Sequence, residues 1–145
     1  MDDGTILALL QEVFEGPPGE YGSLIEHGSG LLSTLAEITP EEASTRPAPG
    51  RPTLAAFAAH LLDGLHYGLA ELRGEAFTGS WEAAWQREQV DEGAWQALQA
   101  EIGQAWSETW ALAERGKVSL GSLLHTTLHL GGLRAMWKGI RAQRG

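Results

Sequence analysis

Two histidines four residues apart, His125 and His129, are the residues whose type and spacing most directly allow chemistry. In an α-helix this spacing places both side chains on one face, with Cβ atoms about 5–6 Å apart, so both imidazoles can bind one metal ion. Gly132, Met136 and Ile140 continue the stripe, so the histidines are expected to face inward. The pair alone is a weak signal, because two buried histidines can instead be hydrogen-bonded to neighbouring groups.

A third histidine, His60, lies within the apolar helical segment of residues 58–62. A lone histidine there is usually a core residue with satisfied ring nitrogens, but helix bundles commonly build metal sites from inward side chains on facing helices. His60 would then complete three nitrogen ligands with His125 and His129. Three neutral imidazoles suit Zn²⁺, Ni²⁺, Fe²⁺ or Cu²⁺. Three protein ligands also leave a position open to water or substrate, which is typical of a reactive site.

Two further side chains, Asp63 and Tyr67, follow His60 by three and seven residues on the same helix face. Asp63 is the candidate catalytic residue, because it could orient a ligand histidine or accept a proton from a metal-bound group. The alternative is a solvated aspartate at the helix edge. Tyr67 is interpreted as a packing residue. His66 lies about 120° round the helix from His60 and His27 falls near a surface or edge, so neither is assigned to the site.

Helical apolar spacing fills the segments between turn-forming stretches at residues 16–19, 47–52, 74–80 and near 116. The helices predicted from it cover residues 5–14, 21–38, 53–73, 91–114 and 119–141, with Thr53 and Asp91 as the N-cap residues of the third and fourth. No strand-like alternation appears between these stretches. The pattern predicts an all-α four-helix bundle with additional short helices, forming one domain over residues 1–145. The longer linkers leave the order of the helices in space open.

The helix predicted for residues 21–38 depends on apolar residues at steps of seven, four and three. These residues are Leu24, Leu31, Leu35 and Ile38. Residues 39–42, Thr-Pro-Glu-Glu, then form a capping box with proline at the first helical position, which predicts a short turn of helix.

Composition excludes several kinds of site. The chain has 145 residues, 43% of them hydrophobic, which is enough for a core that needs no metal to fold. With no cysteine it has no disulfide, thiolate zinc site or cysteine nucleophile, and this fits a reducing cytosol. No signal peptide or membrane-spanning run is recognisable, so a cytoplasmic location is expected.

The formal net charge of −9 is unevenly distributed, because six basic residues and no acidic one follow Glu114. Overall acidity argues against nucleic-acid binding, whose affinity depends on contacts with phosphates. The basic end could hold an anion, although a solvated helix end favoured by the helix dipole is the plainer interpretation. Six tryptophans are explained mainly by core packing, but Trp81 and Trp85 could instead cover a metal pocket or join a dimer interface.

Three segments together resemble the DinB-like (DinB/YfiT) superfamily of metal-dependent enzymes. The first covers residues 35–43 with 46–50, the second covers residues 54–69, and the third covers residues 124–134. The third matches the family pattern H-x-x-x-H-x-G-Q-[ILV], except that Gly132 replaces the glutamine and removes a possible hydrogen-bond donor near the site. The resemblance covers about Leu24 to Met136.

This resemblance implies a four-helix bundle in which His60, His125 and His129 bind a divalent metal, most often nickel or zinc, with iron a further candidate. It also implies a homodimer. Some relatives transfer small thiols such as bacillithiol or mycothiol, or isomerise small acids with a thiol cofactor. We therefore expect a metal-dependent transferase that joins a low-molecular-weight thiol to a small electrophile, or a hydrolase of such adducts. The alternative is a non-catalytic metal- or ligand-binding dimer, and no nucleic-acid or membrane partner is expected.

Overall fold

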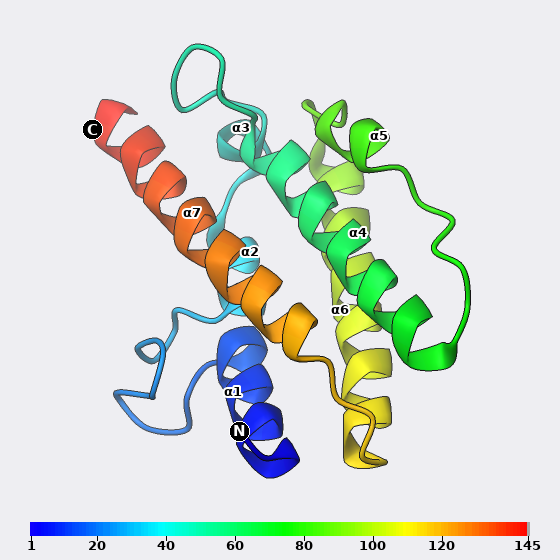
Figure 1. Cartoon of the computed structure of the whole chain (residues 1–145). Helices are drawn as coiled ribbons and strands as arrows, with labels where there is room; N and C mark the ends of the chain where they lie inside the picture. The colour runs from blue at the N-terminus through cyan, green and yellow to red at the C-terminus, as the bar shows by residue number, and fades with distance from the viewer. Residues whose placement is uncertain (145) are drawn as a thin grey trace.

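The computed structural model describes residues 1–144, in which seven helices are joined by loops (Figure 1). They are α1 (Asp3–Glu15), α2 (Leu31–Glu37), α3 (Pro40–Ala43), α4 (Leu54–Arg73), α5 (Trp81–Trp85), α6 (Glu92–Glu114) and α7 (Leu120–Arg144). No strand occurs among these residues, so the all-α prediction is confirmed. Within the same residues, no helix has both the length and the apolar character needed to cross a membrane.

The long helix α4 is central to the arrangement, because it packs along both α6 and α7 (Figure 1). The shorter α1 lies against α7 and α2, and α2 reaches α6. Leucines, alanines and tryptophans from all of these helices form one buried core, in which Trp95, Leu61 and Leu133 are at most 1% exposed. The predicted long helices at residues 53–73, 91–114 and 119–141 are confirmed within a few residues.

The predicted helix over residues 21–38 is wrong in its first half, because only α2 is helical there. Glu12 of α1 takes the place of helical partners by accepting the backbone N–H groups of residues 23, 24 and 25. Gly28 has a φ of 77°, a left-handed conformation that favours glycine and ends helical geometry. Leu24 is consequently 44% exposed, so it does not belong to a buried helix face, contrary to the prediction.

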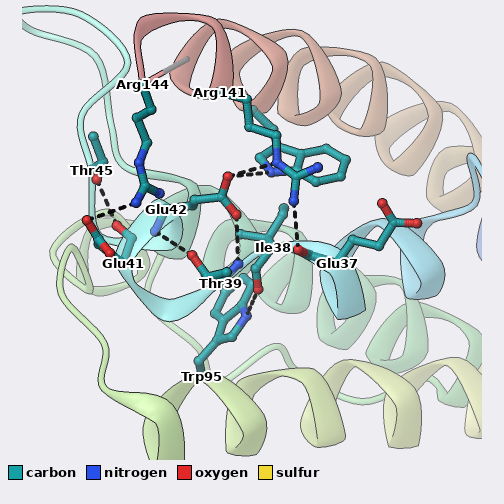
Figure 2. Close-up of polar contacts among 10 residues, drawn as sticks. Glu37, Ile38, Thr39, Glu41, Glu42, Thr45, Trp95, Arg141 and Arg144 are labelled. Carbon is teal, nitrogen blue, oxygen red and sulfur yellow. Dashed lines mark hydrogen bonds and ion pairs between the residues drawn. The ribbon is translucent and has the colours of Figure 1, made fainter.

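The capping box predicted at residues 39–42 is present and starts α3. Its Glu42 is also buried and accepts hydrogen bonds from Arg141 Nε at 2.9 Å and from Trp137 Nε1 at 3.3 Å, both on α7 (Figure 2). Burial alone would raise the pKa of Glu42, but Arg141 and Thr39 hold it below its usual value. One carboxylate therefore joins α3 to the C-terminal part of α7.

The beginning of α4 is similarly well defined by the sequence. Thr53 is fully buried and its hydroxyl accepts the backbone N–H of Ala56, which makes it the predicted N-cap. Asp91 caps α6 in the same way through Ala94. The packing between α4 and α7 then sets the register in which side chains of these two helices face each other.

Candidate metal centre

The three predicted histidines come together between α4 and α7. His60 Nε2 lies 3.1 Å from His129 Nε2 and 3.2 Å from His125 Nε2. One ligand atom from each residue lies within 4.8 Å of the other two. The i,i+4 spacing on α7 presents two rings, and the packing of α4 against α7 brings the third. The predicted convergence on one point is therefore confirmed.

Burial keeps all three imidazoles neutral. Burial, together with repulsion from His129 and then His125 in their protonated forms, lowers the pKa of His60 to about 4. Burial also lowers the pKa of His125 and His129 below the ordinary histidine value. At neutral pH each ring therefore has an unprotonated nitrogen available, which is the form that binds metals.

Aromatic side chains hold the rings in place. Trp85 stacks on His60 with ring centroids 4.3 Å apart and an interplanar angle of 21°. Phe57 meets His129 edge-on at 5.2 Å, and Trp81 lies 5.4 Å from His60. Trp81 and Trp85 thus cover the histidines, which is one of the two roles predicted for them.

The donor set fits a divalent metal of intermediate softness. Three Nε2 atoms face one another, and His60 Nδ1 is buried with no hydrogen-bond partner among the described residues. Metal-bound histidines usually donate the second N–H to a carboxylate or carbonyl. At His60 the stacked ring of Trp85 fixes the orientation of the imidazole instead. Three nitrogens and no thiolate or carboxylate suit Zn²⁺, Ni²⁺, Cu²⁺ or Fe²⁺.

Gly64, one turn after His60 on α4, makes room for His125. A Cβ atom at this position would lie 2.4 Å from Cε1 and 2.5 Å from Nδ1 of the His125 ring. The imidazole therefore packs directly against the α4 backbone. Sequence reasoning missed this residue, although a glycine inside a well-capped helix is itself a signal of close approach.

Asp63 is half-buried on α4, and burial raises the pKa of its carboxyl group while the charges of His66 and Arg87 oppose that shift. Among the described residues no hydrogen bond joins Asp63 to His60, His125 or His129. Its catalytic role therefore stays a prediction.

A cavity of about 280 Å³ opens beside His125. Tyr67 and Gly68 of α4, Trp81 of α5 and Ser122 of α7 contribute to its lining, which is mostly apolar. Tyr67 was predicted to be a packing residue, but it is 43% exposed and forms a wall of this cavity. Of the three histidines, His125 is the one that lines this cavity.

The remaining candidate residues lie outside the cluster of His60, His125 and His129. His66 and His27 are exposed, and His27 belongs to the irregular segment between α1 and α2. Arg134 donates to Thr34 Oγ1 at 2.6 Å and does not line the cavity. Gly132, where the family pattern has glutamine, lies against the ring of Phe57 and lines a separate groove of about 460 Å³.

Comparisons with known proteins identify a family but no individual relative. No curated protein and no solved structure shows significant similarity to the chain. The sequence model of the DinB superfamily matches residues 23–129, a span that begins before α2 and ends at the third histidine. Because that match covers most of the chain and includes all three converging histidines, the chain belongs to the DinB superfamily.

Proposed function

We propose that this protein binds one divalent metal ion, zinc or nickel before iron, through His60, His125 and His129. The observation that carries the proposal is the approach of three Nε2 atoms, with His60 Nε2 at 3.1 Å from that of His129 and 3.2 Å from that of His125. Neutral rings at physiological pH and the stacked Trp85 favour binding without prior rearrangement.

The test is elemental analysis of protein purified without an affinity tag, followed by titration with zinc and nickel. We expect one metal per chain in the wild type and strongly weakened binding in His129→Ala. His27→Ala is the matched control, because it removes an exposed histidine far along the chain from the three. Equal metal content in wild type and His129→Ala would refute the site.

We further propose that the protein joins a low-molecular-weight thiol to a small electrophile, or cleaves such an adduct. A bound metal would lower the pKa of a thiol and so favour a nucleophilic sulfur at neutral pH. The chain has no cysteine, so the sulfur has to come from a cosubstrate. The cavity beside His125 would admit the electrophile, and Trp81 and Trp85 would exclude water from the rings. A cytosolic setting, where small thiols stay reduced, suits this reaction.

Asp63 is the proposed proton acceptor of this reaction. Burial raises its pKa, which makes the carboxylate a better base than a fully solvated aspartate. Because it lies one turn from His60, a proton released near the histidines could reach it through water.

The assay combines zinc- or nickel-loaded protein with bacillithiol, mycothiol, coenzyme A or glutathione and a fluorogenic electrophile. We expect turnover with at least one thiol, loss of turnover in His129→Ala, and a reduced rate with retained metal in Asp63→Asn. Circular dichroism checks the fold of both variants. Equal activity in wild type and His129→Ala would show that the metal does not serve this reaction. Absence of turnover across the panel, from metal-loaded protein, would favour the non-catalytic alternative.

That alternative, a metal- or ligand-binding homodimer, is favoured by one surface. Leu120, Leu124 and Leu128 form a row on α7 and are 43%, 60% and 72% exposed. No charged residue occurs between Ser119 and Leu133, so two copies could meet there without burying a charge. We propose a second copy of this chain as the occupant. Light scattering should give twice 15.6 kDa for the wild type and 15.6 kDa for Leu124→Glu. A monomeric wild type at micromolar concentration would refute the dimer.

A further inference from the structure

The lining of the cavity beside His125 carries a negative charge that does not come from the three histidines. Glu71 is the only charged side chain among the described residues that line it. None of the ion pairs within residues 1–144 involves Glu71, and Arg73, its nearest basic neighbour in the chain, pairs instead with Glu108 at 3.2 Å. The negative charge of Glu71 therefore remains available to a ligand.

The rest of the lining suits a small flat molecule. The rings of Tyr67 and Trp81 lie 5.9 Å apart between centroids, and Trp81 lies 6.3 Å from the ring of His125. Gly64 and Gly68 also line the cavity and contribute no side chains of their own. Aromatic walls bind both apolar rings and cations, because the face of an aromatic ring carries negative charge density.

One feature opposes a cationic ligand. The N-terminus of α7 lies at the same cavity, and its helix dipole favours an anion there. That dipole is equivalent to about half a charge, and Ser119 Oγ already accepts the N–H of Ser122 at 3.0 Å. The full charge of Glu71, in the same cavity lining as two aromatic rings, outweighs this partly satisfied terminus.

We infer that this cavity is the substrate pocket of the proposed metal centre and that it selects small aromatic molecules carrying an amine over those carrying a carboxylate. The amine would lie near Glu71, between the helix end and Tyr67, while the ring would lie against Trp81 with its far edge toward His125. Calling the bound molecule a substrate rests on the proposed function, whereas the charge preference depends only on the residues that line the cavity.

The test uses metal-free ¹⁵N-labelled protein and three probes of similar shape, namely benzylamine, benzyl alcohol and benzoate. Binding is followed through the indole N–H signal of Trp81, which is identified with Trp81→Phe. We expect benzylamine to bind about fivefold more tightly than benzyl alcohol, and benzoate to bind most weakly. Glu71→Gln should reduce benzylamine to the level of benzyl alcohol. Glu75→Gln, an exposed glutamate outside this cavity, should leave the preference unchanged.

Three results would overturn the inference: benzoate binding at least as tightly as benzylamine, a preference that survives Glu71→Gln, or no shift of the Trp81 signal with any probe. Zinc titration of the same samples distinguishes failure of this inference from failure of the proposed metal centre. Loss of the charge preference with intact zinc binding would overturn the pocket assignment alone. An intact preference without zinc binding would overturn the metal centre alone.

Discussion

Replacing Gly64 by alanine should damage the metal centre without damaging the fold. The new Cβ would lie 2.4 Å from His125 Cε1. The imidazole therefore has to retreat by roughly 1 Å to restore an ordinary carbon–carbon contact. Metal–ligand distances tolerate only about 0.2 Å. We expect zinc affinity to fall about tenfold to hundredfold, the range found when the support of a ligand is removed.

Stability should change in the opposite direction. Alanine is favoured over glycine inside a helix by up to about 1 kcal/mol, and the atoms in contact belong to a movable side chain rather than to backbone. The metal-free Gly64→Ala protein should therefore unfold at the same urea concentration as the wild type or a higher one. Affinity is measured by competition with a chromophoric zinc chelator.

Gly103→Ala on α6 is the matched control for this variant, because a Cβ there meets nothing within 4 Å. It should share any gain in helix stability and leave zinc affinity unchanged. If Gly64→Ala binds zinc as tightly as Gly103→Ala does, the ring of His125 does not depend on the glycine and the reasoning is refuted.

Three further outcomes are expected. The pKa of His60 is lowered from 6.5 to about 4 in the folded state, so the unfolded chain binds more protons than the folded one between these pH values. The stability of the metal-free protein should therefore fall as the pH drops from 6.5 to 4. Urea unfolding should show a less steep fall for His60→Gln. Glu42→Ala should cost about 2–3 kcal/mol in the free energy of unfolding, because the buried Trp137 Nε1 loses its acceptor and Arg141 loses its charged partner. Glu41→Ala, which breaks an exposed ion pair, should cost less than about 1 kcal/mol, and equal costs for the two variants would contradict this prediction. Glu12→Ala should speed proteolysis between α1 and α2 because three backbone N–H groups lose their acceptor, whereas the exposed Gln11→Ala should not.

Local signals in the sequence predicted much of this molecule. The caps at Thr53 and Asp91 and the capping box at Thr39 depend on residues at most three positions apart, so they could be read without knowing the fold. The i,i+4 spacing of His125 and His129 likewise determined that both rings share one helix face.

Tertiary structure decided what these signals could not. The segment around Leu24 has helical spacing, but its backbone N–H groups bind the carboxylate of Glu12, more than ten residues earlier. Such a partner leaves no trace in local periodicity.

The same distinction between local sequence signals and tertiary contacts applies to the candidate site. The sequence by itself determined which histidines could act together, because helical periodicity and the family pattern both depend on short spacings. Only the packing of α4 against α7 decided that His60 meets His125 and His129, that Gly64 must lack a side chain, and that Tyr67 and Glu71 line a cavity. The contacts of His60 and Gly64 with α7 join residues more than sixty positions apart. Their geometry depends on the register of two helices, which no spacing within either helix encodes.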